Sequence, residues 1–330
     1  MPLNASNSSS PTFKVFARQV APFAPLALAL LMNAVPPSTS APEKAAGEPS
    51  SSGITAVKCG DEIADSQDCH SRYPTGCNAN GQYDAYLNYW KDQLIDPATA
   101  SNPVKYYTDL ADYKKLDSSI PSGLTTDDQG GFQVQLKQLG EGQQYGIVGY
   151  LYYSHPTAAE SSNCELTGPP GDPNYGNVDY HIGIGFDPTV AQQLRSDAAA
   201  RSEASTAPTA PGKPTKKPTS SGSGASSLEQ TSVIVEMTPH DRFRYENGIW
   251  TLSNLKLAAG RQVRVIGQLM IDNEHNLSSQ NCAIAQTATD KQTCWRASVW
   301  ELHPVVRFQV CPNDSCTPDS TDWVELDQLQ

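Results

Sequence analysis

The sequence predicts a mainly β protein built around a small five-stranded barrel. Apolar and polar residues alternate with a period of two in five segments, which is typical of strands with one buried face: 144–155, 178–186, 231–238, 261–272 and 295–311. Between the third and fourth segments, Trp250, Leu252, Leu255 and Leu257 follow a helical spacing that ends at Gly260. Five strands with a helix between the third and the fourth give the β-β-β-α-β-β order of an OB-fold barrel. We therefore expect an OB-like barrel over residues 130–311.

A small helical unit that contains cysteines is expected before the barrel, over residues 54–129. In its segment GQYDAYLNYWKDQL (81–94), apolar residues recur at steps of three and four. This stripe is typical of a helix that packs against a core, and an aromatic binding platform is the alternative. Residues 312–330, after the barrel, are expected to form a C-terminal tail.

Residues 188–230 interrupt the strand pattern. Much of this stretch is rich in Pro, Ser, Gly and Thr and has little apolar surface to bury, so we expect a disordered insertion between the second and third strands. Its lysines (Lys213, Lys216 and Lys217) favour a solubilising loop, with a basic tether for an anionic surface as the alternative.

The N-terminus predicts export. Lys14 and Arg18 precede an apolar run whose uninterrupted part, 26–31, is too short to span a membrane and is typical of a signal peptide. We expect a signal peptide over residues 1–41, with an uncleaved anchor as the alternative, followed by a linker over 42–53. The mature chain is then periplasmic or extracellular, with no membrane span.

An even number of cysteines supports an exported chain, because disulfides persist in oxidising compartments. Close spacing favours three pairs, and the two remaining cysteines would form the fourth: Cys69–Cys77, Cys282–Cys294, Cys311–Cys316 and Cys59–Cys164. The chain has no C-x-x-C motif, which argues against a zinc site made of cysteines.

Charge and motifs disfavour several classes of function. The formal net charge is −12 and the pI is near 4.9, whereas a nucleic-acid-binding surface requires clustered Lys and Arg. The sequence contains no G-x-S-x-G elbow, no phosphate-binding P-loop and no Rossmann glycine pattern.

Four motifs of this chain resemble those of a group of exported bacterial OB-like proteins. They are a D-Y-H strand at 179–181, a V-V-E-type strand at 233–236, a D-x-E-H turn at 272–275 and a W-E-[IL]-H-P-V strand at 300–305. The resemblance covers most of residues 69–311, and the insertion at 188–230 departs from it. It implies the fold and this set of motifs, but no activity.

The strand alternation orients the polar residues of these motifs. The apolar sets must fill the barrel, so the opposite set points outward: Asp179, His181, Glu236, Asp272, Glu301 and His303. The order of strands in an OB barrel would place these residues on adjacent strands as one patch, which His275 could join from the turn after the fourth strand. The flanking loops, 156–177 and 273–294, border the usual OB binding surface.

Three interpretations of this patch remain open. It is a structural network that docks the N-terminal unit, a surface that binds a ligand, or a catalytic site. In a catalytic site, His181, His275 and His303 would hold a divalent metal such as zinc while Glu236 or Glu301 acts as the base. A version without metal would use a histidine as acid and a carboxylate as base. The sequence lacks H-E-x-x-H or another recognised metal spacing.

The favoured function is therefore an exported binding or interaction module that uses the outward polar face. Its ligand is not specified by the sequence, and an envelope protein is a candidate partner. A metal-dependent hydrolase is the alternative, and a nucleic-acid binder, which rests on analogy between folds, is third.

Overall fold

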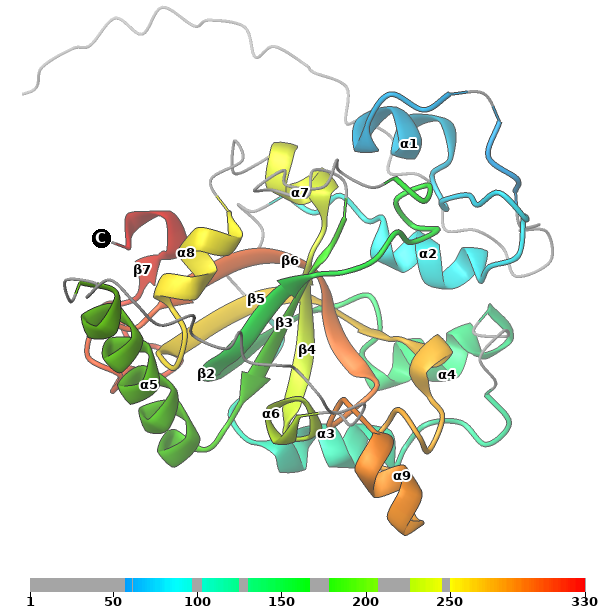
Figure 1. The fold of residues 1–330 in the computed structure, drawn as a ribbon. Helices are drawn as coiled ribbons and strands as arrows, with labels where there is room; N and C mark the ends of the chain where they lie inside the picture. Colours follow the sequence, from blue (N-terminus) through cyan, green and yellow to red (C-terminus); the bar gives the residue numbers. More distant parts are fainter. Residues whose placement is uncertain are drawn as a thin grey trace, which may run out of the picture. The chain divides into compact units, whose positions relative to one another are not determined.

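The computed structural model describes residues 57–60, 62–96, 103–124, 130–166, 178–206, 226–244 and 250–329 (Figure 1). All of them belong to the unit Glu48–Gln330. The predicted signal peptide and linker lie outside the described residues, as does the lysine-containing part of the predicted insertion.

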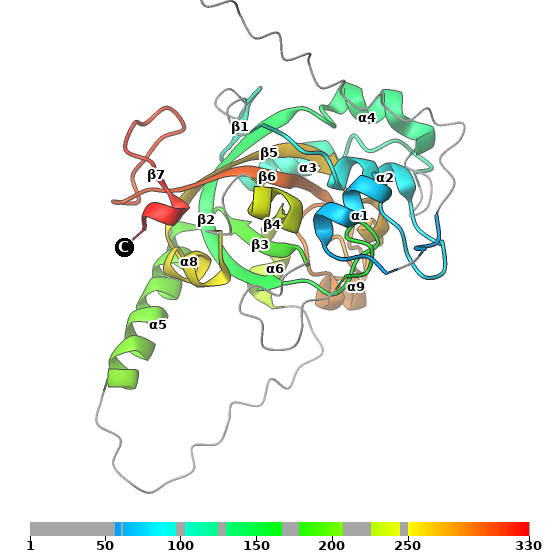
Figure 2. The same cartoon turned by 90° about the horizontal axis from the view of Figure 1, so that it is seen from above.

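Five strands form a closed barrel, as predicted. They are β2 (Gln144–Pro156), β3 (Tyr180–Gly185), β4 (Ser232–Met237), β5 (Gln262–Ile271) and β6 (Trp300–Val310). The order is β2-β3-β4-β6-β5, and pairing of β5 with β2 closes the barrel. Figure 2 shows β2 curving far enough to pair with both neighbours. Only the β4–β6 pair is parallel among these five strands of the described chain.

Two further short strands pair with strands of the barrel. β1 (Tyr106–Tyr107) runs parallel to β2, and β7 (Val324–Glu325) pairs antiparallel with β6. The predicted C-terminal tail therefore contributes to the fold, and Leu326, in the 3-10 helix η4 (Leu326–Gln328), is fully buried in the core.

Short helices surround the barrel. Four precede or adjoin β2: α1 (Ser66–Arg72), α2 (Ala85–Lys91), α3 (Leu110–Asp117) and α4 (Gln133–Leu139), the last after the 3-10 helix η2 (Gly130–Phe132). Between β4 and β5 lie α7 (Pro239–Arg244) and α8 (Leu252–Leu257), where one helix is predicted. The loop between β5 and β6 contains the 3-10 helix η3 (Asn273–His275) and α9 (Ala288–Thr293). In both Figures 1 and 2, α1 and α2 lie on one side of the barrel, and α5 (Pro188–Thr206) and α8 lie on the other.

The interior of the barrel is apolar, and the predicted alternation explains it. Side chains from alternate positions of the strands form one core cluster, which α8 extends through Leu252 and Leu255. In β3 these are Tyr180, Ile182 and Ile184, so the residues between them face outward.

The interpretation of 188–230 as disordered throughout is wrong over its first part and at its end. Pro188–Thr206 forms the helix α5, and Ser227–Gln230 forms α6 just before β4. Pro188 occupies the first position of α5, where its fixed backbone angle favours a helix, and the following sequence is rich in alanine and other strong helix formers. Ala191 is fully buried and Arg195 donates a hydrogen bond to the carbonyl of Gly260, so the helix is anchored at its start.

Four disulfides join all eight cysteines. Cys282–Cys294 and Cys311–Cys316 are the predicted pairs, but Cys69–Cys77 and Cys59–Cys164 are wrong, because the bonds are Cys59–Cys77 and Cys69–Cys164. A bridge between Lys58 and Asn78 aligns Cys59 with Cys77, which leaves Cys69 in α1 to meet the loop after β2. Four disulfides indicate an oxidising environment. Within the described ranges, no helix combines the length and the apolar character that a membrane span needs.

Candidate functional site

The predicted polar residues meet on the outer face of the barrel. His181 on β3 and Glu236 on β4 are direct cross-strand partners, and β6 lies beside β4 on the other side. The imidazole Nε2 of His181 lies 2.6 Å from Oε1 of Glu236. The Nδ1 atom of His303 lies 3.2 Å from Oε2 of Glu236 and 3.2 Å from Oε1 of Glu301. Strand alternation thus brings these motifs together as expected.

Three further charged residues complete the group, and the sequence analysis missed them. Lys91 comes from α2, Glu160 from the loop after β2, and Arg296 from the segment before β6. We call the following nine residues the polar cluster: Lys91, Glu160, Asp179, His181, Glu236, Asp272, Arg296, Glu301 and His303. Lys91 and Glu160 join the cluster through residues distant in the sequence, so no local spacing marks them. Arg296 contacts the distant Asp272 as well as Glu301, five residues further along the chain.

Ion pairs connect the additions to the predicted residues. The Lys91 Nζ atom lies 3.4 Å from Oε2 of Glu160 and 3.9 Å from Oδ2 of Asp272. The Nη1 atom of Arg296 lies 3.3 Å from Oδ2 of Asp272 and 3.2 Å from Oε2 of Glu301. A covering segment and a barrel strand therefore share one network of charges.

Most of the polar cluster is buried, which is the arrangement expected of a network that docks the N-terminal unit. Glu236, Glu301 and His303 are all 0% exposed. The cover consists of α1, α2 and the loops after β2 and β5. The outer face therefore lies beneath other parts of the chain, although its side chains point away from the barrel interior. Of the predicted site residues, His181 and His275 keep contact with solvent, with side chains 14% and 30% exposed.

The burial changes the proton affinities inside the cluster. Burial raises the pKa of Glu236 well above its usual value, and the neighbouring charge of Glu301 raises it further. Burial opposes protonation of His303, but the surrounding carboxylates, Glu236 first, outweigh this and raise its pKa. The two shifts together indicate that the His303–Glu236 pair retains a proton near neutral pH. Burial lowers the pKa of His181, which keeps its imidazole neutral.

A second pair of histidines joins the cover to the barrel. The Nδ1 atoms of His70 in α1 and His240 in α7 lie 2.6 Å apart, and His70 Nε2 lies 3.2 Å from the carbonyl oxygen of Ser162. Burial lowers the pKa of His70 to about 3, and the nearby His240 adds to the effect. The neutral imidazole of His70 therefore acts as a structural contact between helix and loop.

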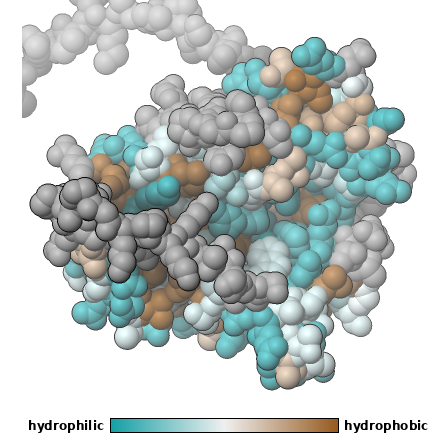
Figure 3. Space-filling model, in the orientation of Figure 1, coloured by the Kyte–Doolittle hydropathy of each residue, from teal (hydrophilic) through white to brown (hydrophobic). Residues whose placement is uncertain are grey.

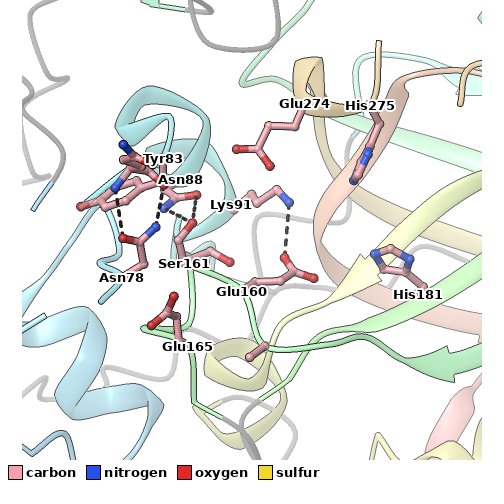
Figure 4. Close-up of a pocket in the computed structure, with 13 residues that line it drawn as sticks. Asn78, Tyr83, Asn88, Lys91, Glu160, Ser161, Glu165, His181, Glu274 and His275 are labelled. Atoms are coloured by element: carbon pink, nitrogen blue, oxygen red, sulfur yellow. Dashed lines mark hydrogen bonds and ion pairs between the residues drawn. The ribbon is translucent and has the colours of Figure 1, made fainter. Parts of the chain in front are cut away.

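Two adjoining cavities open beside the polar cluster, of about 320 and 380 Å³. Glu160, His181 and His275 line both of them. Figure 4 shows Lys91, Glu160 and His181 pointing toward a common space in the first cavity. Much of the remaining wall consists of side-chain amides, hydroxyls and carboxylates, for example the amide of Asn78. The second cavity has an aromatic wall that includes Tyr153 and Trp295. Hydrophilic residues predominate on the face in Figure 3 between α2 and α9.

The glycines of β3 do not admit a ligand to the sheet. A side chain at Gly183 would meet the ring of Tyr153, and one at Gly185 would meet the ring of Tyr152. The two glycines therefore make room for aromatic rings of the neighbouring strand.

The three histidines of the predicted metal site do not form one ligand set. His303 is buried beside Asp179 and Glu236, whereas His275 lies at the cavity, 3.6 Å from Asp272, with its ring 4.9 Å from that of Trp295. Among the described residues, two groups place three ligand atoms within 4.8 Å of one another: Glu160, His181 and Glu236, and Asp179, Glu236 and His303. Each group has one histidine and two carboxylates. Glu236 belongs to both, while Glu301 interacts with Arg296 and His303.

Comparisons of the chain with family models, with curated proteins and with solved structures returned no match in any of the three.

Proposed function

We propose that this chain is an exported binding module, in which an OB-fold barrel holds a small polar ligand of the saccharide type. The signal-like N-terminus and the four disulfides support export. The strand order and the four motifs that resemble exported OB-like proteins support the OB assignment.

The position of the two cavities carries the proposal. They lie over β3, beside the loops after the first and fourth barrel strands, and share Glu160, His181 and His275. OB-fold proteins bind oligosaccharides and oligonucleotides on this outer face, between the corresponding loops. A concave site with convergent polar groups is the usual form of a small-molecule site.

The chemistry of the walls favours a saccharide over a polyanion. Amides and carboxylates of the first cavity, such as Asn88 and Glu165, can exchange hydrogen bonds with hydroxyl groups, while Trp295 and Tyr153 in the second offer flat apolar surfaces to the C–H face of a sugar ring. A nucleic acid would meet Glu160, Glu165 and Glu274 in the first cavity and an overall charge of −12. The hydrolase hypothesis has less support, because its three histidines do not converge.

The proposal is tested by titrating the tag-free mature chain with neutral sugars, using isothermal calorimetry. Glucose, N-acetylglucosamine and their short oligomers are suitable probes. We expect at least one oligomer to bind, and Trp295→Ala to weaken its binding at least about tenfold, because stacking on an aromatic ring contributes about 1–3 kcal/mol when a base is the partner. Tyr150→Ala is the control, because Tyr150 is also half-buried but lies outside both cavities. Failure of every probe, or equal binding by the two variants, would refute the saccharide site.

A further inference from the structure

We infer that Glu160, His181 and Glu236 form a binding site for one divalent transition-metal ion, with zinc preferred. The site differs from the three-histidine set expected from sequence, because Glu160 replaces His275 and Glu236 replaces His303. The inference rests on the proposed binding face, since the ion would form part of the cavity wall, but separate measurements test the two.

The ligand atoms are close to coordination geometry. One atom from each of the three residues lies within 4.8 Å of the other two. Zinc holds imidazole nitrogen and carboxylate oxygen at about 2.0–2.2 Å, which sets ligand atoms about 3.3 Å apart in a tetrahedral site. His181 Nε2 and Glu236 Oε1, now 2.6 Å apart, would separate slightly to admit the ion. The remaining adjustment is a small side-chain movement of Glu160, which is the most exposed of the three.

The backbone holds two of the ligands rigidly and the third on a tethered loop. His181 and Glu236 are cross-strand partners on β3 and β4, so the barrel sets their separation. Glu160 precedes Cys164, whose disulfide to Cys69 ties the loop to α1. A site built mainly on strands requires little rearrangement when the ion enters.

Glu236 is a buried carboxylate that contacts imidazoles but has no hydrogen bond of good geometry within the described residues. Its side chain is 0% exposed, and among the described residues neither of its oxygens accepts a hydrogen bond of good geometry. Its close contacts are the imidazoles of His181 and His303.

The charges around the site favour a cation. Six carboxylates of the described chain interact here with three permanent cations: Asp92, Glu160, Asp179, Glu236, Asp272 and Glu301, against Lys91, Arg242 and Arg296. The carboxylates outnumber the Lys and Arg side chains by three, in a region of low dielectric constant where an unpaired charge is costly. A bound divalent ion would offset most of this excess.

Lys91 does not take the place of this ion. Its ammonium group contacts Oε2 of Glu160 and Oδ2 of Asp272, and no ion pair within 4 Å joins it to Glu236 in the described part of the chain. Lys91 therefore pairs with Glu160 and Asp272, and no Lys or Arg of the described residues lies within 4 Å of the Glu236 carboxylate.

The cavity provides access, and the donor set selects the ion. Glu160 and His181 line both cavities, so water or a hydroxyl group of a bound ligand can complete the coordination shell from that side. Calcium and magnesium prefer oxygen donors alone, whereas one imidazole with two carboxylates suits zinc, and manganese less strongly.

The test is calorimetric titration of the tag-free full chain, with its disulfides intact and metals removed by EDTA, with zinc chloride at neutral pH. We expect one zinc ion per chain. Glu160→Gln and His181→Asn should each weaken the zinc Kd at least about tenfold, the smallest loss seen when even an indirect metal contact is removed. Glu165→Gln and His275→Asn are matched controls, because both residues line the same cavity but lie outside the ligand set. Both controls should bind zinc as the unchanged protein does.

The outcomes separate the two proposals. Absence of stoichiometric zinc binding by the unchanged protein overturns the metal site, and this measurement depends on no variant. A loss in His275→Asn as large as that in His181→Asn also overturns it, in favour of a set containing His275. Sugar binding by metal-free protein that takes up no zinc leaves the binding module standing without the metal. Zinc binding by a protein that binds no sugar supports the metal site and refutes the saccharide ligand.

Discussion

Arg296 is the residue whose loss should most clearly reveal how the polar cluster is held together. Its side chain is 0% exposed, and its Nη1 atom lies within 3.3 Å of Asp272 and Glu301. The guanidinium group also lies over the ring of Trp295, 4.4 Å from the ring centre. Arg296→Met keeps much of the length of the side chain and removes the charge, so two buried carboxylates lose their shared cation.

The size of the effect follows from burial. Breaking a buried ion pair by removal of one partner costs about 3–5 kcal/mol, because the remaining charge is left without compensation. The same substitution at Arg307 is the control. Arg307 pairs with Glu325, but the two side chains are 35% and 33% exposed, so solvent screens the pair and its loss should cost about 0–1 kcal/mol.

The assay is urea unfolding at neutral pH, followed by tryptophan fluorescence with the disulfides intact. Arg296→Met should lower the free energy of unfolding by about 3–5 kcal/mol. The double variant Arg296→Met/Glu301→Gln should be less destabilised than the single one, because it removes one of the two uncompensated carboxylates. A cost for Arg296→Met no larger than that for Arg307→Met would refute the reasoning, as would a double variant with simply additive losses.

Three other predictions concern stability. Burial holds the pKa of His70 at about 3, against 6.5 in the unfolded chain. Below pH 6.5 the unfolded state therefore binds a proton that the folded state excludes. The free energy of unfolding should fall as the pH drops, by about 2 kcal/mol at pH 5. Urea unfolding between pH 5 and 7 measures this, and an unchanged pH dependence in His70→Asn would contradict it. Cys69→Ser/Cys164→Ser removes a disulfide that spans 95 residues and should cost about 4–5 kcal/mol by loop entropy; a loss below about 1 kcal/mol in the same assay would contradict that estimate. Gly185→Ala should lower the melting temperature, at a cost of about 1–3 kcal/mol, because the new methyl group meets the ring of Tyr152; an unchanged melting temperature would show that the ring moves aside freely.

The sequence was informative wherever a local pattern determines the structure. Alternation of apolar and polar residues in the five strands reflects a sheet with one apolar face. The barrel could be predicted from this alternation, and so could the outward direction of residues such as His181 and Glu236. Cys282–Cys294 and Cys311–Cys316 close short loops and were paired correctly from their spacing, whereas the same rule failed for Cys69 and Cys77.

Composition alone misled at α5. The Pro, Ser and Gly content of residues 188–230 as a whole concealed a first part rich in helix formers, and the anchor of Arg195 on Gly260 joins residues far apart in the sequence. The pairing of Cys69 with Cys164 likewise depends on how α1 meets the loop after β2.

For the candidate site, the sequence by itself determined which polar residues share the outer face, because side-chain direction along a strand is a local property. Only the tertiary structure decided that this face is buried, that Lys91, Glu160 and Arg296 join it, and that His275 and His303 lie in different environments. Burial and charge partners depend on which distant segments fold over the strands, and these properties set the proton affinities and the metal-binding capacity of the site.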